Sequence, residues 1–221
     1  MGQLKIDFKP RSWSFSAMHS YENCALQFLL ARTEPVESEP SWALEHGLHC
    51  HTLMENYLKG IIDGVPVELK PFESELKKLK DVGALAEEEI VLDRHWDIVE
   101  GDNPWRSKDA WIRAKLDARW DSLIVDLKTG REYDHYAEQA DLYATMRMQI
   151  DREIGEIDVE FWYTKSGEVA SFTFMRSEQE ERIEAWEVRV RKLMTEKHWL
   201  PSINIGCRWC AYQERCELFN D

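Results

Sequence analysis

The sequence has no apolar run near the ~20 residues that a membrane-spanning helix needs. Its mean hydropathy of -0.54 and its 32% of charged residues also exclude a membrane-spanning protein and favour a soluble globular fold. The first dozen residues alternate charged residues with single apolar ones, so they hold no signal-peptide core. We therefore expect a cytoplasmic protein, and its 221 residues are enough to bury a core of their own.

Basic residues are few. The chain has 28 Lys and Arg against 42 Asp and Glu, which gives a formal net charge of -14. Taken alone, this imbalance argues against nonspecific binding to nucleic acid. Carboxylates gathered around bound cations, however, make a site locally positive while the total charge stays negative. Net charge therefore leaves nucleic-acid binding open.

Cysteines are also few and odd in number, with five in the chain. An odd count without an export signal does not indicate a disulfide framework. Metal ligands or free thiols are the better interpretation. Three of the five close the chain as Cys207, Cys210 and Cys216, a fourth is Cys24 near its beginning, and Cys50 precedes His51.

Helix caps and apolar spacing predict a helical first third of the chain. The three expected helices run from a cap at Ser14 or Ser16 to about Arg32, from a cap at Ser41 through Tyr57, and from Pro71 to just before Gly83. Strand patterns follow at about 88–92, 111–120, 123–128, 157–164 and 169–175, with helices at about 132–149 and 177–198. This order predicts a mixed α/β fold with helices packed on one mixed or antiparallel sheet.

A charged hairpin is the most informative stretch. If 121–122 is a two-residue turn, Asp117 lies opposite Asp126 and Lys115 lies opposite Lys128. The Cβ atoms of directly opposed side chains are about 4.5–5.5 Å apart, so two carboxylates there repel each other unless a cation lies between them. The hairpin therefore predicts a metal site.

Asp126 and Lys128 are two residues apart on a strand and point the same way, while Leu123, Val125 and Leu127 point to the other, buried face. An acid and a lysine on one face can hold a hard cation and keep an ammonium near an attacking water. The alternative is a solvated face on which the lysines neutralise the aspartates. An isolated Asp-x-Lys does not decide between them.

Asp117 followed by Asp126-Leu127-Lys128 resembles the core of the PD-(D/E)XK nucleases. Downstream, Gln139 and Tyr143 match the Gln-x-x-x-Tyr helix of the RecB-like branch of that superfamily. These two residues are four apart and so share one face of a helix. The resemblance implies a restriction-endonuclease-like core with a central mixed sheet.

Two upstream positions extend this resemblance. The segment from Gly47 to His51 is similar to the Gly-x-x-x-His of the RecB-like branch, which implies that His51 is a metal ligand. Without that pattern His51 would be taken as a capped or core histidine. Glu88 and Glu89 are candidates for an acidic position on the preceding strand, although a run of glutamates usually marks a solvated edge.

The cysteines resemble those of iron–sulfur RecB-like nucleases, which include the AddB nuclease domain and the CRISPR-associated RecB-like exonucleases. That resemblance implies a 4Fe-4S cluster held by Cys24, Cys207, Cys210 and Cys216. The cluster would clasp segments of about 16–32 and 201–221 over a single nuclease domain spanning 1–221. Ala25 departs from the family, which commonly has proline there. Thiolates also suit zinc, so zinc or free thiols remain alternatives, and Cys50 is interpreted as a buried thiol.

Tryptophans are numerous, with ten in the chain. Trp96, Trp105, Trp111 and Trp120 lie among basic residues, including Arg106, Lys108, Arg113 and Arg119. Such a mixture can stack bases and hold phosphates. Tryptophans at strand spacing more often belong to a core, and both interpretations stay open.

The family resemblance implies a metal-dependent DNA exonuclease acting on single-stranded DNA or DNA ends. Mg²⁺ or Mn²⁺ would be held by His51, Asp117, Asp126 and the carbonyl of Leu127. Lys128 would orient a water and offset charge in the transition state, and Gln139 and Tyr143 would position Lys128 or the DNA backbone.

Two rival functions are compatible with the same residues. One is a DNA-binding or adaptor subunit with a vestigial nuclease site, working with recombination, repair or CRISPR-adaptation proteins. The complete set of His51, Asp117, Asp126 and Lys128 argues against such decay. The other is a zinc-clasped structural protein without a catalytic role.

Overall fold

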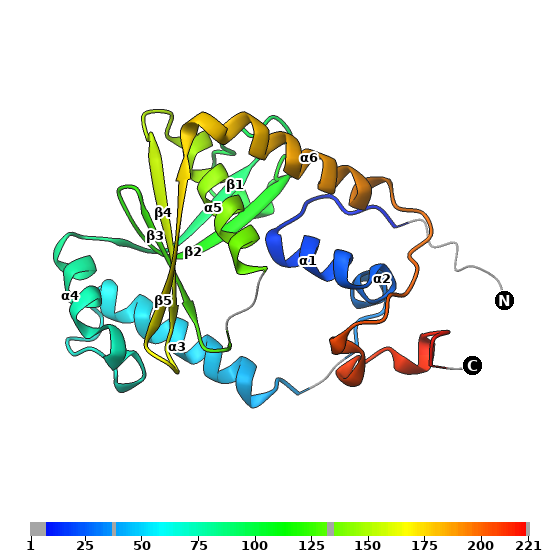
Figure 1. The fold of residues 1–221 in the computed structure, drawn as a ribbon, viewed down its shortest axis with the longest axis horizontal. Coiled ribbons are helices and arrows are strands. Elements are labelled where there is room, and N and C mark those ends of the chain that lie inside the picture. Colours follow the sequence, from blue (N-terminus) through cyan, green and yellow to red (C-terminus); the bar gives the residue numbers. More distant parts are fainter. Residues whose placement is uncertain (1–7, 37–38, 132–134, 220–221) are drawn as a thin grey trace. The chain divides into compact units, whose positions relative to one another are not determined.

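The computed structural model describes residues 8–36, 39–131 and 135–219, which form two compact units (Figure 1). Unit 1 comprises Met1–Glu39 and Glu184–Asp221, and unit 2 comprises Pro40–Ile183. Both segments expected to form the clasp therefore belong to unit 1. None of the described helices is both long enough and apolar enough to cross a bilayer. The expectation of one nuclease domain over 1–221 stays a prediction.

Unit 2 is built on a five-stranded mixed sheet, as the strand patterns predict. The strands lie in the order β1 (Leu85–Leu92), β2 (Ile112–Trp120), β3 (Leu123–Lys128), β4 (Glu156–Tyr163) and β5 (Glu168–Met175). Neighbours are antiparallel except β3 and β4, which are parallel and are joined through helix α5 (Tyr136–Ile150). A parallel pair needs such a crossover, because the end of the first strand and the start of the second lie at opposite ends of the sheet.

The remaining helices of unit 2 are α3 (Trp42–Leu58), the 3-10 helix η1 (Val67–Phe72) and α4 (Glu73–Asp81). The hydroxyl of Ser41 accepts a hydrogen bond from the N–H of Leu44 at 3.3 Å, which confirms the expected cap of α3. The third helix does not open at Pro71, because Pro71 lies inside η1 and the α-helix begins at Glu73.

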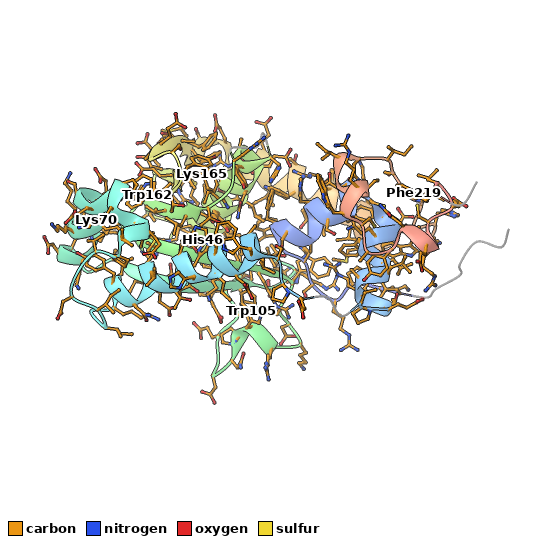
Figure 2. The ribbon with its side chains drawn as sticks, turned by 90° about the horizontal axis from the view of Figure 1, so that it is seen from below. His46, Lys70, Trp105, Trp162, Lys165 and Phe219 are labelled. Carbon is orange, nitrogen blue, oxygen red and sulfur yellow. The ribbon has the colours of Figure 1, made fainter. Side chains whose placement is uncertain are left out.

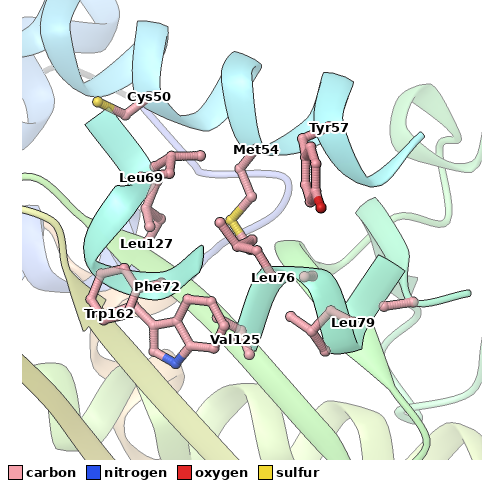
Figure 3. Close-up of a cluster of buried hydrophobic side chains, with 12 residues drawn as sticks. Cys50, Met54, Tyr57, Leu69, Phe72, Leu76, Leu79, Val125, Leu127 and Trp162 are labelled. Atoms are coloured by element: carbon pink, nitrogen blue, oxygen red, sulfur yellow. The ribbon is translucent and has the colours of Figure 1, made fainter. Parts of the chain in front are cut away.

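One core cluster of unit 2 lies between one face of the sheet and α3, η1 and α4 (Figure 3). Val125 and Leu127 point into it from β3, as their alternation with Asp126 predicts. The ring of Phe72 stacks on Trp162 of β4 at 4.9 Å. Cys50 is fully buried in this cluster, which confirms its interpretation as a buried thiol, and burial raises the pKa of that thiol.

Unit 1 contains α1 (Phe15–Asn23), α2 (Ala25–Thr33), the 3-10 helices η4 (Ile205–Trp209) and η5 (Gln213–Arg215), and most of α6 (Gln179–Thr195). The prediction of one helix running to Arg32 is wrong. Cys24 has an extended backbone (φ -163°, ψ 106°), and its sulfur accepts a hydrogen bond from the N–H of Gln27 at 3.4 Å. The thiol therefore caps a second helix where apolar spacing alone indicated continuity.

The last helix differs from its predicted bounds at both ends. A short 3-10 helix, η3 (Arg176–Glu178), precedes α6, so Ser177 lies inside that turn and the α-helix begins at Gln179. The helix ends at Thr195, short of the expected His198. The otherwise irregular connection between β1 and β2 contains the short 3-10 helix η2 (Pro104–Arg106).

The core supports a matched stability test within η1. Leu69 is fully buried, whereas Val67 in the same helix is 76% exposed. Leu69→Ala leaves a cavity and should lower the free energy of unfolding by about 2–5 kcal/mol, whereas Val67→Ala should change it by less than about 0.5 kcal/mol. Urea denaturation followed by circular dichroism measures both. Equal losses in the two variants would contradict this assignment of the core.

Candidate active site

The β2–β3 hairpin has the turn that its sequence predicts. The paired residues are Ala118 with Val125, Arg119 with Ile124, and Trp120 with Leu123. Beyond these pairs, the N–H of Leu127 donates to Asp117 Oδ2 at 2.7 Å. A side-chain carboxylate thus takes the place of a main-chain acceptor. The hydrogen bond holds Asp117 next to the 126–127 segment of β3, and the backbone pairing of the two strands ends here.

The predicted pairing of Lys115 with Lys128 is wrong. The β2–β3 pairs end at Ala118 and Val125, and the ammonium of Lys115 contacts the carboxylate of Glu87 on β1. The ammonium of Lys128 lies 2.6 Å from Asp126 Oδ2. The two lysines therefore neutralise different carboxylates, because the regular ladder does not continue past the point where the Asp117 side chain enters.

Three potential metal ligands converge from three elements. His51 comes from α3, Glu87 from β1 and Asp117 from β2, and one ligand atom of each lies within 4.8 Å of the others. The Nδ1 atom of His51 is 2.9 Å from Asp117 Oδ1. One imidazole and two carboxylates form a donor set suited to a divalent cation that accepts oxygen and nitrogen ligands.

Gly47 explains how α3 reaches this position. A Cβ atom built on Gly47 would lie 3.2 Å from Thr129 Oγ1, just after β3. A larger residue would press the helix away from the strand end, whereas glycine permits close approach. Since His51 follows one turn later on the same face, the Gly-x-x-x-His spacing has a packing reason.

Glu87 is the site residue that the sequence patterns missed. Glu88 and Glu89 were the expected candidates, but Glu88 forms a two-pronged ion pair with Arg119 at 2.5 and 3.0 Å. The flanking pairs Ala86–Ala118 and Glu88–Leu116 place Glu87 across from Asp117. Its φ of +57° is unusual for a non-glycine residue in a strand, and such strain of roughly 1–3 kcal/mol gathers at functional sites.

Lys128 is held from several sides. Besides its contact with Asp126, its ammonium donates to Gln139 Oε1 at 2.9 Å. The ammonium also lies 4.5 Å from the ring centre of Tyr136 and 4.9 Å from that of Phe161. These cation–π contacts and ion pairs leave its side chain only 14% exposed, so the position of the ammonium is tightly defined.

Gln139 and Tyr143 share the inner face of α5, as their spacing predicts. The Nε2 group of Gln139 donates to the hydroxyl of Tyr143 at 2.7 Å, and that hydroxyl donates to Asp126 Oδ1 at 3.2 Å. Burial raises the pKa of Tyr143 well above its ordinary value, so the hydroxyl keeps its proton and acts as a donor. The helix thus orients both members of the Asp126–Lys128 pair.

Burial and neighbouring acidic groups shift the pKa values of the site. Burial raises the pKa of Asp126 to about 6, and the charge of Asp117 adds to this effect, while Lys128 opposes it. Burial lowers the pKa of His51, but its hydrogen bond to Asp117 and the charges of Asp117, Asp126 and Glu87 outweigh burial and raise it. A divalent cation would relieve this excess of negative charge.

The cysteines predicted to bind a cluster lie in unit 1. Cys24 is buried in an apolar cluster with Leu26, Leu30 and Tyr212, against which Cys210 and Cys216 pack. The sulfur of Cys207 accepts a hydrogen bond from the N–H of Asn204 at 3.3 Å. Among the described residues, no cysteine belongs to a group of three or more potential ligand atoms within 4.8 Å of one another, so the cysteine site stays a prediction.

Two of the four tryptophans named in the base-stacking interpretation, Trp96 and Trp111, belong to the buried core. Arg94 covers the ring of Trp111 at 3.7 Å. Trp111 precedes Asp117 by six residues, a separation of roughly 20 Å along a strand. Trp105 lies on η2 and is labelled in Figure 2. The interpretation of these residues as core is therefore correct for Trp96 and Trp111.

Comparison with known proteins finds a match to one family model and a similar solved structure. Residues 115–217 match the model of the PD-(D/E)XK nuclease superfamily. A crystal structure of a protein named SSO0001 is similar at 13% identity and a TM-score of 0.46, over 98% of this chain and 90% of that chain. No curated protein sequence matches this chain. The matched residues 115–217, slightly less than half of the chain, include Asp117, Asp126 and Lys128 and are similar to a domain of the PD-(D/E)XK nuclease superfamily.

Proposed function

We propose that the protein is a metal-dependent DNA exonuclease that acts on single-stranded DNA or DNA ends, in recombination, repair or phage- or CRISPR-related DNA processing. The observation behind this proposal is the position of Asp117. One of its oxygens contacts His51 in the ligand group, and the other accepts from Leu127 beside the Asp126–Lys128 pair. The carboxylate of Asp117 therefore links the proposed metal ligands to the strand that carries the Lys128 ammonium.

The residues present fit a hard divalent cation. His51, Glu87 and Asp117 would hold Mg²⁺ or Mn²⁺, and Asp126 and the Leu127 carbonyl are further proposed ligands. Burial and then the charge of Asp117 raise the pKa of Asp126 even though Lys128 opposes them, which fits a site where a cation would be favourable. When bound, the cation would supply Lewis-acid stabilisation of negative charge on the scissile phosphate.

The chain's own groups would supply the rest of the chemistry. Lys128 is fixed by Asp126 and Gln139, so its ammonium can orient the attacking water and offset charge on the transferred phosphoryl group. Tyr143 stays protonated and holds Asp126 in place. Such preorganisation matters because a group already in position needs no reorganisation during the reaction.

We also propose that Cys24, Cys207, Cys210 and Cys216 hold a 4Fe-4S cluster. The sulfurs of Cys24 and Cys207 each accept a backbone N–H hydrogen bond, an interaction that stabilises thiolates and tunes iron–sulfur clusters. The apolar surroundings of Cys24 would shield a cluster from solvent. Its role would be structural, because it would tie together two ends of the chain.

Lys128→Ala tests the catalytic assignment. Loss of the ammonium should slow cleavage at least about 100-fold, while Mn²⁺ affinity changes by less than about threefold. Asp117→Ala should abolish both DNA cleavage and Mn²⁺ binding. Product ladders from single- and double-stranded DNA labelled at each end measure cleavage and polarity, and calorimetry measures Mn²⁺. Wild-type protein that binds DNA and Mn²⁺ without cutting would instead identify a vestigial adaptor subunit.

Glu87 and Glu88 form a matched pair of adjacent glutamates. Glu87→Gln removes a ligand carboxylate and should weaken Mn²⁺ binding at least about tenfold. Glu88→Gln disturbs only the ion pair with Arg119 and should change Mn²⁺ affinity by less than about threefold. Calorimetric titration of both variants makes the comparison. Weaker binding in Glu88→Gln than in Glu87→Gln would refute the role of Glu87.

Cys207→Ala tests the thiolate-bound cofactor. Anaerobically purified wild-type protein should contain iron and absorb visible light, and the variant should lose iron, colour and thermal stability together. Cys50→Ala, which alters a thiol outside the proposed ligand set, should keep its iron. A colourless wild-type protein that contains zinc would replace the iron–sulfur proposal with a zinc site, since Zn²⁺ is d¹⁰.

A further inference from the structure

We propose that Lys115 is a second functional lysine of the site, one that neutralises Glu87 before metal binding and then contacts a DNA phosphate. This inference rests on the proposed nuclease function. It assigns a substrate-binding role to a residue outside the Asp126-x-Lys128 motif. It also implies an order of events, in which the cation must arrive before the DNA is held firmly.

Lys115 lies two residues before Asp117 on β2, so the two side chains leave the same side of the strand. Its ammonium contacts the carboxylate of Glu87, the same carboxylate that lies within 4.8 Å of the ligand atoms of His51 and Asp117. An ammonium and a divalent cation would therefore compete for Glu87. Binding of the cation should release the ammonium.

The two lysines of the site differ in how firmly they are held. The side chain of Lys128 is 14% exposed and is fixed by Asp126, Gln139 and two aromatic rings. The side chain of Lys115 is 49% exposed. A lysine has a flexible stem with four rotatable bonds, so an exposed ammonium can exchange partners at little cost. Lys128 therefore suits fixed chemistry, and Lys115 suits a change of partner.

The charges around Lys115 explain why its partner would change. The carboxylates of Glu87, Glu55 and Glu89 all act on its ammonium. Without a cation, these acids repel a DNA phosphate, and Lys115 is occupied with Glu87. Once a cation neutralises Glu87, that attraction weakens and the ammonium can turn toward a phosphate in solvent. In a chain with a net charge of -14, such a local cation provides attraction that the surface as a whole does not.

The first measurement is Mn²⁺ binding without DNA. Lys115→Met removes the competing ammonium and keeps the length of the side chain, so Mn²⁺ affinity should rise roughly five- to tenfold. The control is Lys77→Met, because Lys77 is 57% exposed and contacts Glu73 at 2.8 Å on α4, within the same unit. That control should bind Mn²⁺ within about twofold of wild type. Unchanged or weaker binding in Lys115→Met would overturn the proposal.

The second measurement is the salt dependence of single-stranded DNA binding with Mn²⁺, in the Lys128→Ala background to prevent cleavage. Adding Lys115→Met should lower the slope of log K against log salt by about 0.7, the value for one lost phosphate contact. Lys115→Arg keeps a positive charge and should retain the slope. If Lys115 has only a structural role, Lys115→Met will neither lower the slope nor raise the Mn²⁺ affinity. An unchanged slope would overturn the proposed phosphate contact.

The outcomes separate this inference from the proposed function. If wild-type protein does not bind Mn²⁺, the proposed nuclease site and the role of Lys115 both fail. If wild type binds Mn²⁺ and cuts DNA, but Lys115→Met behaves as wild type in both measurements, only the role of Lys115 fails. Circular dichroism spectra that match wild type ensure that the variants are compared in the folded state.

Discussion

The carboxylate of Asp117 is the interaction on which the site depends. It replaces a main-chain acceptor between β2 and β3, since the N–H of Leu127 donates to Oδ2, and it positions His51 of α3 through Oδ1. Backbone pairing between the strands stops there, which opens space for side chains from β1 and α5. One acidic residue thus sets both the shape of the sheet and the arrangement of charges.

The charges of the site are tolerated rather than favoured by the fold. Burial and neighbouring charge raise the pKa of Asp126 to about 6, and Glu87 adopts a strained left-handed backbone. Features of this kind cost stability and gather where a protein binds or reacts. The well-packed cluster of unit 2 below Val125 and Leu127 supplies the stability that permits them.

Local spacing made much of the site predictable. The two-residue turn fixed Asp117 beside Asp126, and four-residue spacing placed Gln139 with Tyr143 on one helix face. Glu87 could not be predicted in the same way, because the long connection between β1 and β2 leaves the pairing register of these two strands undefined by the sequence. The helix break at Cys24 could not be predicted either, because a thiol is an uncommon helix cap. Its hydrogen bond with the N–H of Gln27 is evident only from the structure.

The long β1–β2 connection starts at the end of those strands that is remote from Glu87 and Asp117. Its exposed residues include Gly101, which has a φ of +128°, and Asp102. Loop tips of this kind accept extra residues readily. Evolution, or an engineer adding a fluorescent label or a fused module, could therefore lengthen this connection without altering the distances among the acidic groups and lysines.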